Sequence, residues 1–177
     1  MTTMLIGGTG FVGLNAAEAL LARGQTVLLH ALDAPPEPAR AAFASLPGRL
    51  IAVQGDARDT AALVALAEAH RVDRVVYAAA ITAGPARERA AAARILETNA
   101  VAAEALYQAM AGQAPAGRLT RFVFLSSVAV YGEAGYGRPV TDESVEPVPD
   151  SLYAISKFTV ERALRRLRDP ARGDRSR

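Results

Sequence analysis

The sequence contains no cysteine and only two histidines among its 177 residues. The absence of cysteine excludes disulfides and thiolate metal sites, and it leaves the redox compartment open. The two histidines, His30 and His70, stand far apart in the sequence, whereas metal sites gather three or four ligands. We therefore expect no metal centre.

Long apolar runs without charge are also absent, so no segment reaches the length that spans a bilayer. The first residues, MTTMLIGGTG, run directly into an apolar stretch and a glycine-rich loop, without a basic leader or cleavage site. With 51% apolar residues, the chain can build the core of one domain. These features predict a cytoplasmic globular protein with no membrane partner.

Lysine is nearly absent, because Lys157 is the single lysine beside 19 arginines. The formal net charge is +2, but residues 161–177 hold seven arginines against three acids. A basic end of this kind can touch nucleic acid, yet no aromatic residues interleave with the arginines and no recognition motif accompanies them. We expect a solvated helix face with a frayed end, and no nucleic-acid partner.

Apolar runs of strand length alternate with alanine-rich runs of helix length along the chain. The expected strands are Met4–Ile6, Thr26–Leu29, Leu50–Val53, Arg74–Ala78 and Arg121–Ser126, and the expected helices are Phe11–Ala22, Ala39–Ala44, Thr60–His70, Ala86–Met110 and Ser151–Arg168. Strands without alternating polarity are typical of a parallel sheet covered on both faces. The pattern predicts an α/β fold, a doubly wound parallel sheet in three layers over residues 1–168, and a basic tail at 169–177.

The stretch GGTGFVG follows the first expected strand and opens the first expected helix. Its glycines, Gly7, Gly10 and Gly13, suit a tight turn, a close approach of the backbone to a pyrophosphate, and close packing of helix on strand. The amino end of the helix would face the phosphates. The spacing is weak by itself, but this setting predicts a dinucleotide site.

An acid should follow the second strand and bind the adenosine ribose hydroxyls. The nearest candidate is Asp33, which stands slightly beyond the expected strand end and is equally well explained as a turn residue before Pro35. No arginine follows to neutralise a 2′-phosphate, which favours NAD and leaves NADP as the alternative. Asp56 follows the third strand, where it would reach the adenine, form a turn, or help to cap the next helix.

Tyr153 and Lys157 stand four residues apart and share a face of the last expected helix, whose start is predicted by Ser151. An ammonium beside a phenol stabilises the phenolate and lowers the phenol's pKa, so the tyrosine becomes an acid and base near neutral pH. The compact ammonium also suits ribose hydroxyls better than an arginine fork does. The alternative is that the tyrosine and the lysine have this spacing by chance on an exposed helix and take no part in catalysis.

The serines Ser126 and Ser127 end the last expected strand, where α/β folds place ligand-binding groups. A serine there can hold a substrate oxygen for proton transfer with Tyr153. Residues 132–150, rich in proline, glycine and acids, predict a surface loop that borders the ligand site.

The motifs GGTGFVG, GDARD, VVYAAA, ETNAVAAEAL, FLSSVAVYG and YAISK follow one another along the chain. In this order they resemble the extended short-chain dehydrogenase/reductases, the NAD-dependent epimerase/dehydratase group, from about Met4 to Arg166. The resemblance implies a Rossmann-like fold and an NAD(P)-dependent oxidoreductase or epimerase. Its substrate would be a hydroxyl or ketone of a sugar nucleotide or a related polar molecule.

The resemblance also implies roles for individual residues. The cofactor would contact Gly7, Thr9, Gly10, Phe11, Val12, Gly13, Asp33, Asp56, Ala57, Ala78, Ala79, Ala80, Tyr153 and Lys157. The catalytic set would be Ser127, Tyr153 and Lys157, supported by Asn99. Tyr153 would exchange the proton of a substrate hydroxyl while hydride passes to or from the nicotinamide, and Ser127 would orient the oxygen.

The sequence also departs from the family pattern. The acid of the second strand would be expected near Ala31, and an Asp-Glu pair typical of dehydratases is replaced by Val128 and Ala129, which favours epimerisation or dehydrogenation. The family continues beyond the tyrosine-lysine helix with a substrate-binding region, so we expect a shortened form without it. A catalytically silent fragment that binds nucleotide, or only folds, is the alternative. The family's homodimer would form through the Ala86–Met110 and Ser151–Arg168 helices.

Overall fold

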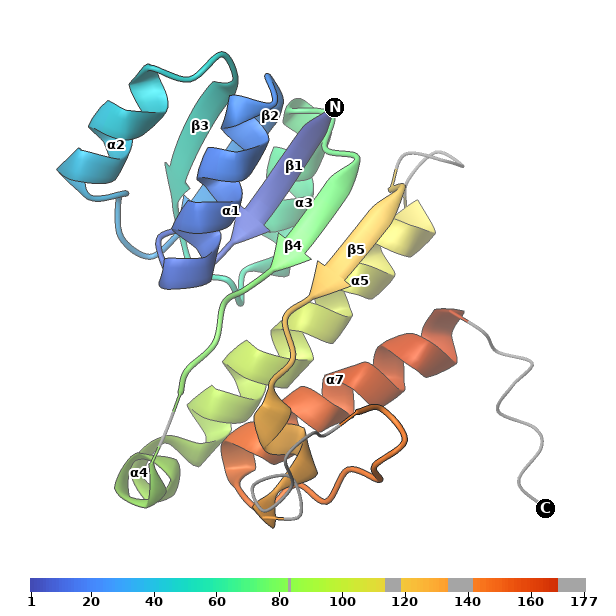
Figure 1. Ribbon diagram of the computed structural model, residues 1–177. Helices are drawn as coiled ribbons and strands as arrows, with labels where there is room; N and C mark the ends of the chain where they lie inside the picture. The colour runs from blue at the N-terminus through green and yellow to red at the C-terminus, as the bar shows by residue number, and fades with distance from the viewer. Residues whose placement is uncertain (83, 114–118, 134–141, 169–177) are drawn as a thin grey trace. The chain divides into compact units, whose positions relative to one another are not determined.

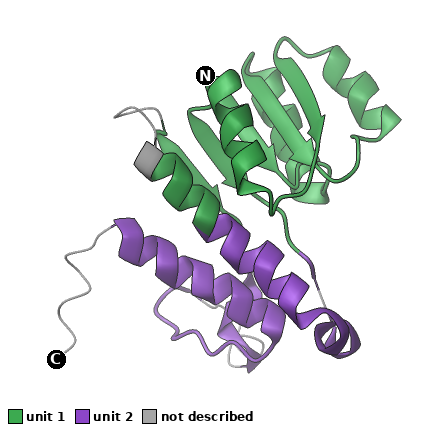
Figure 2. Cartoon of the chain, turned by 180° about the vertical axis from the view of Figure 1, so that it is seen from behind, with its two compact units in different colours: residues 1–80, 105–125 green, residues 81–104, 126–177 purple. Residues whose placement is uncertain are grey.

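The computed structural model describes residues 1–82, 84–113, 119–133 and 142–168. The chain divides into two compact units, the first formed by residues 1–80 and 105–125 and the second by residues 81–104 and 126–177 (Figure 2). The expected basic tail and residues 134–141 of the expected loop lie outside the described residues. No helix of the described residues has the length and apolar composition needed to cross a membrane.

The first unit is built on a parallel sheet of five strands in the order β3-β2-β1-β4-β5 (Figure 1). Its strands are β1 (Thr2–Ile6), β2 (Thr26–Ala31), β3 (Arg49–Gln54), β4 (Arg74–Tyr77) and β5 (Arg121–Phe124), and its helices are α1 (Phe11–Ala22), α2 (Glu37–Ala44), α3 (Thr60–Ala69) and the larger part of α5 (Ala102–Gln113). α1 and α2 cover one face of the sheet, whereas α3 and the end of α5 cover the other. The predicted doubly wound parallel sheet is confirmed.

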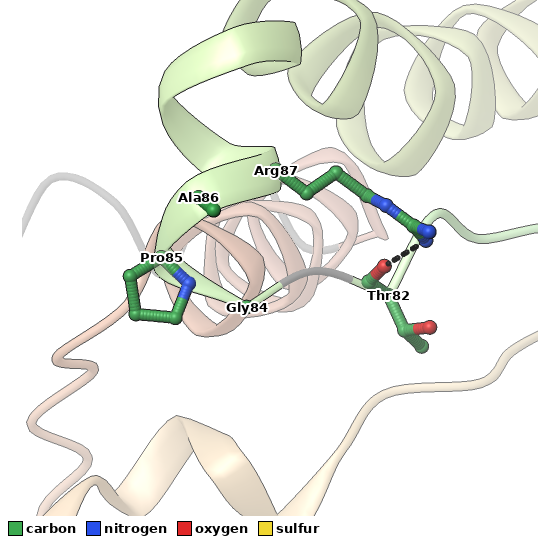
Figure 3. Close-up of a pocket in the computed structure, with 5 residues that line it drawn as sticks. All are labelled: Thr82, Gly84, Pro85, Ala86 and Arg87. Carbon is green, nitrogen blue, oxygen red and sulfur yellow. Dashed lines mark hydrogen bonds between the residues drawn. The ribbon is translucent and has the colours of Figure 1, made fainter.

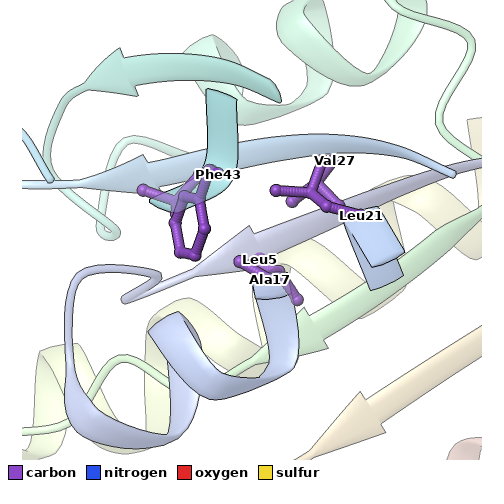
Figure 4. Packing of buried hydrophobic residues seen from close by; sticks show 6 residues of the cluster. Leu5, Ala17, Leu21, Val27 and Phe43 are labelled. Atoms are coloured by element: carbon purple, nitrogen blue, oxygen red, sulfur yellow. The ribbon is translucent and has the colours of Figure 1, made fainter. Parts of the chain in front are cut away.

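The buried strands explain why the sequence shows no alternation of polarity. Leu5 of β1 and Val27 of β2 pack with Leu21 of α1 and Phe43 of α2 in one apolar cluster (Figure 4), to which Leu29 also belongs. The intervening strand residues Met4, Ile6 and Leu28 are fully buried as well. Both faces of the central strands are therefore covered, as expected for parallel strands between helical layers.

The sheet register brings three strand ends to the same level. Ile6 of β1 pairs with His30 of β2 on one side and with Tyr77 of β4 on the other. From β1 the chain adds β2 and β3 on one side of this strand and then β4 and β5 on the other. The loops after β1 and β4 therefore flank the point where the strand order reverses. Ligands of open α/β sheets bind at such a point.

The second unit consists mainly of helices. They are α4 (Pro85–Leu96), the π-helical turn η1 (Glu97–Val101), the first residues of α5, the 3₁₀ turn η2 (Val128–Tyr131) and α7 (Leu152–Arg168), with α7 packed against α4, η1 and η2. The helix expected over Ala86–Met110 is present as α4, η1 and α5, but it is not one regular α-helix. The backbone leaves helical geometry at Ala91, and η1 replaces α-helical hydrogen bonding from Glu97 onward.

Candidate functional site

The glycine loop after β1 is shaped by contacts that admit no side chain at two positions. Gly7 has a φ of +76°, and a Cβ atom there would lie 2.5 Å from the backbone nitrogen of Ala79. A Cβ atom on Gly13 would lie 2.6 Å from the Cα atom of Gly8, so α1 packs directly on the loop. The two glycines thus have the predicted functions of tight turn and close helix packing.

Backbone hydrogen bonds hold this loop against the sheet. The N–H groups of Gly7 and Gly8 both donate to the carbonyl oxygen of His30, at 2.9 and 3.1 Å. Gly10 is the N-cap residue of α1, and the first turn of this helix contains no acid. The positive end of the helix dipole is therefore not neutralised locally, which favours an anion at this position. Phe11 and Val12 are exposed there, with 85% and 51% of their surface accessible.

The loop after β4 lies beside the glycine loop within the same unit. Ala78 donates its N–H to the carbonyl of Ile6 at 2.8 Å, and Ala79 is buried against Gly7. Tyr77 precedes them with its ring packed on Phe124, and burial, helped by the Asp56 carboxylate, raises the pKa of Tyr77. This phenol is therefore held neutral and is unsuited to acid-base chemistry.

The candidate acids occupy distinct environments. β2 ends at the buried Ala31, and Asp33 lies exposed two residues beyond it. Asp56 accepts the backbone N–H of Arg58 at 2.9 Å and pairs with the Arg58 guanidinium at 2.6 Å, so it forms the turn before α3. The N-cap of α3 is instead Asp59, which accepts the N–H of Ala62.

His30 lies beneath the turn after β3, because a Cβ atom on Gly55 would lie 2.5 Å from its Nε2 atom. Burial lowers the pKa of His30, and the carboxylates of Asp56 and Asp59 partly oppose this effect. The residue after Asp56, Ala57, is almost completely buried. Gly55, Asp56 and Ala57 thus form a closely packed turn next to the ends of β2 and β3.

In the second unit, the amino end of α7 is capped from two directions. The hydroxyl of Ser151 accepts the N–H of Ala154 at 3.2 Å, as the sequence predicts. Glu88 of α4 accepts the N–H of Tyr153 at 3.1 Å, which places a carboxylate at the positive end of the α7 dipole. The start of the helix that carries Tyr153 is therefore fixed by both its own sequence and α4.

Lys157, the single lysine, is buried on α7 with 2% of its surface accessible. Its Nζ atom lies 5.8 Å from the centre of the Tyr153 ring, so the two side chains share one face of α7, as the four-residue spacing predicts. Burial lowers the pKa of Lys157 to about 8. The side chain therefore remains predominantly charged at neutral pH.

The two serines at residues 126 and 127 have different partners. The Ser126 hydroxyl donates to Oε1 of Glu161, whereas the Ser127 hydroxyl accepts the N–H of Ala129 at 3.2 Å and caps η2. A hydroxyl that accepts one hydrogen bond still has its own proton to donate. Ser127 is accordingly better suited than Ser126 to bind a substrate oxygen.

Asn99 is completely buried in the π-helical turn and connects two segments of the second unit. Its Oδ1 accepts the N–H of Ile81 at 2.7 Å, and its Nδ2 donates to the Ile81 carbonyl at 3.0 Å and to Oγ of Ser156 at 3.2 Å. Ser156 in turn donates to the carbonyl of Tyr153 at 2.7 Å. The amide thus ties the chain after Ala80 to the turn of α7 between Tyr153 and Lys157.

An open hollow lies at the start of α4, lined by Thr82, Gly84, Pro85, Ala86 and Arg87 (Figure 3). The Arg87 guanidinium donates to the Thr82 carbonyl at 3.2 Å and covers one side of this hollow. Among the described residues, no group of three or more potential ligands has the arrangement of a metal site.

Comparison with known proteins identifies the family. The profile of the NAD dependent epimerase/dehydratase family matches residues 3–173. The chain belongs to this family. A family relative, the dTDP-6-deoxy-L-talose 4-dehydrogenase (NAD(P)(+)) of Kitasatospora kifunensis, is 36% identical over 160 residues, which cover 90% of this chain and 45% of the relative. The UDP-glucose 4-epimerase of Neisseria gonorrhoeae is 31% identical over 166 residues, or 93% of this chain and 47% of that protein.

The solved structure of the Stenotrophomonas maltophila UDP-glucose-4-epimerase, with bound NAD and formylated UDP-arabinopyranose, matches with a TM-score of 0.80 and 24% identity. The match covers 94% of this chain and 48% of that one, and at this identity it shows the fold alone. The chain thus spans about half the length of the curated relatives in the NAD dependent epimerase/dehydratase family that it matches.

For this NAD dependent epimerase/dehydratase family member, the structure groups the predicted residues by unit. The glycine loop, Asp33, Asp56 and Ala78–Ala80 belong to the first unit, and Asn99, Ser127, Tyr153 and Lys157 belong to the second. Three further polar residues, Glu88, Ser156 and Glu161, contact this second group or its neighbours in the chain. Sequence spacing gives no sign of Glu88, whereas Ser156 and Glu161 lie within about one turn of Lys157 on α7 and are noticeable in retrospect.

Proposed function

We propose that this chain binds NAD and takes part in oxidation or epimerisation of a sugar-nucleotide hydroxyl. The observation that carries the proposal is the buried Lys157 ammonium beside the Tyr153 phenol. The named relatives, a dTDP-sugar dehydrogenase and UDP-glucose epimerases, support the substrate class.

The residues of the first unit fit a dinucleotide. Gly7 makes a turn that no other residue fits, because a Cβ atom there would clash with the backbone of Ala79. The positive end of α1, which has no acid in its first turn, lies at the same loop. We assign the pyrophosphate to Gly7, Thr9, Gly10, Phe11, Val12 and Gly13, the adenosine to Asp33, Asp56 and Ala57, and one wall to Ala78, Ala79 and Ala80. The absence of an arginine after Asp33 favours NAD over NADP.

The residues of the second unit supply the proton chemistry. Tyr153, as the phenolate, accepts the proton of the substrate hydroxyl, and the Lys157 ammonium stabilises this phenolate before the proton arrives. The Ser127 hydroxyl donates a hydrogen bond to the substrate oxygen and thereby orients it. NAD, when bound, supplies the hydride acceptor. Asn99 holds the turn between Tyr153 and Lys157 through Ser156.

Epimerisation or simple dehydrogenation fits this chain better than dehydration. Elimination of water requires a further acid and base beside the serine, and residues 128 and 129 are valine and alanine. The second candidate function is nucleotide binding without turnover, which the glycine loop of the first unit supports without help from Tyr153 and Lys157. A homodimer through residues 86–110 and 151–168 accords with the exposed Val101 and Ile155 on these helices.

The first test is a titration of the purified chain with NADH and NADPH, followed by nicotinamide fluorescence and by thermal stability. Saturable binding of NADH, with weaker binding of NADPH, is the expected result. Turnover is then measured with dTDP-6-deoxy-L-talose and UDP-glucose as probes. Binding without turnover of any hydroxyl substrate would favour the second candidate function, and binding of neither nucleotide by a folded chain would refute both.

Tyr153→Phe separates binding from chemistry, because the substitution removes only the phenolic oxygen. We expect unchanged NADH affinity and a loss of turnover of roughly a hundredfold or more, since a positioned acid-base group contributes about that much. The control is Tyr107→Phe, at a tyrosine packed edge-on against Phe122 in the first unit. Equal turnover in Tyr153→Phe and the wild type would refute the catalytic assignment.

A further inference from the structure

The Ser126–Glu161 hydrogen bond is not used by the proposed chemistry. The Ser126 hydroxyl donates to Oε1 of Glu161, and the other carboxylate oxygen lies 3.6 Å from the Arg165 guanidinium. The Glu161 side chain is 21% accessible, so the pair is largely shielded from solvent. A hydroxyl-carboxylate bond in such a setting is charge-assisted and is stronger than a bond between neutral groups.

Glu161 has a defined place relative to the proposed catalytic residues. It follows Lys157 by four residues, as Lys157 follows Tyr153, so the three side chains form one row along α7. Ser126 precedes Ser127 directly, and the Ser127 hydroxyl accepts the Ala129 N–H at the start of η2. η2 itself packs against α7.

We propose that Glu161 is a positioning residue that anchors Ser126 to α7 and thereby sets the place of the Ser127 hydroxyl relative to Tyr153. The inference rests on the proposed function for its catalytic consequence, but the anchoring itself does not. One helix then carries the acid-base group, the ammonium and the anchor for the serine. Ser127 and Tyr153 come from separate segments of the chain, and the Ser126–Glu161 bond connects the serine segment to the helix that carries Tyr153.

Two backbone amides of the second unit can report whether Ser127 is held in place. The amide of Ala129 donates to Ser127 Oγ at 3.2 Å, and the amide of Ala154 donates to Ser151 Oγ at the same distance in the same unit. Amide hydrogen exchange at these two positions, measured by NMR, distinguishes local release of Ser127 from loosening of the whole unit. The measurement requires neither cofactor nor substrate.

The variants are Glu161→Ala, Ser126→Ala, their double mutant and Glu161→Gln. We expect each alanine variant to accelerate exchange at Ala129 by roughly tenfold or more, the range for loss of a bond to a charged group, and to leave Ala154 unchanged. The double mutant should add little to either single mutant, because both remove the same bond. Glu161→Gln should restore most of the protection, since its amide oxygen still accepts the hydroxyl.

Arg165→Ala is the control for the ion pair, because it removes the exposed partner of Glu161 and leaves the Ser126 bond intact. Unchanged exchange at Ala129 in Glu161→Ala, or equal acceleration at Ala129 and Ala154, would overturn the inference. Where the wild type turns over a probe, kcat should fall in both alanine variants with KM unchanged. A chain without turnover would refute the proposed function alone, and the exchange result would still decide the anchoring.

Discussion

The pH dependence of stability should report directly on the buried Lys157. Burial lowers the pKa of this side chain from 10.5 to about 8. Because a difference of one in pKa corresponds to about 1.4 kcal/mol, the charged lysine costs the folded chain about 3 kcal/mol. This cost is fully present below about pH 8. Between about pH 8 and about pH 10.5 only the unfolded chain keeps the proton, so the free energy of unfolding rises across this window.

Lys157→Met removes the titrating group and keeps an unbranched side chain. Urea unfolding of both proteins, followed by circular dichroism at steps from about pH 7 to about pH 10.5, measures the difference between their unfolding free energies. We expect the wild type to gain about 3 kcal/mol relative to Lys157→Met across this range. Tyr77, with its raised pKa, lowers stability above about pH 10 in both proteins and cancels in the difference.

Lys157→Arg is the matched control, because guanidinium keeps its proton throughout the range. Its profile should be parallel to that of Lys157→Met, at lower stability. Parallel profiles of the wild type and both variants would refute the conclusion that Lys157 is buried with its charge.

Two further substitutions test the loop and the asparagine. Gly13→Ala brings a Cβ atom to 2.6 Å from the Cα atom of Gly8, so it should lower the free energy of unfolding in urea by about 1–3 kcal/mol and weaken NADH binding. The control, Gly84→Ala, has no neighbour within 4 Å of its Cβ position and should change neither quantity. Equal effects of the two would contradict the packing argument. Asn99→Ala leaves the Ile81 backbone groups and the Ser156 hydroxyl without this partner, and it should lower the unfolding free energy by about 2–4 kcal/mol. The control, Val101→Ala, changes an exposed residue of the same turn, and a similar loss there would show that Asn99 has no special role.

The fold was predictable because its signals are local. The buried strands lack polar alternation, and the glycine loop has its place between β1 and α1, whose bounds match the prediction at Phe11–Ala22. Strand ends were less accurate: β2 continues to Ala31 and β3 begins at Arg49, one residue before the apolar run. The polar or small residues at these ends still pair with neighbouring strands, which composition cannot indicate.

The site was predictable only in part, for a physical reason. The Tyr153–Lys157 pair follows from helical spacing, and Ser151 follows from capping preferences. Asn99 came only from the family resemblance, because its bonds to Ile81 and Ser156 join residues 18 and 57 positions away. Such distant contacts depend on packing that no local pattern encodes. The sequence allows Asp56 to contact the adenine, to form a turn or to cap α3; in the structure Asp56 forms the turn, and the cap is Asp59.

The π-helical turn at Glu97–Val101 accommodates one extra residue in this part of the chain. A π-helical turn contains one residue more than the α-helical turn it replaces, so it shifts the helical phase of the residues after it. Deletion of one residue other than Asn99 within it would restore α-helical hydrogen bonding and leave the following side chains close to their present phase, whereas deletion of a residue from the regular part of α5 would rotate the side chains on one side of the deletion by about 100° around the helix axis. Substitutions at exposed positions such as Val101 keep this phase. The π-helical turn is therefore the place in this part of the chain where loss of one residue would preserve the faces of the following helix.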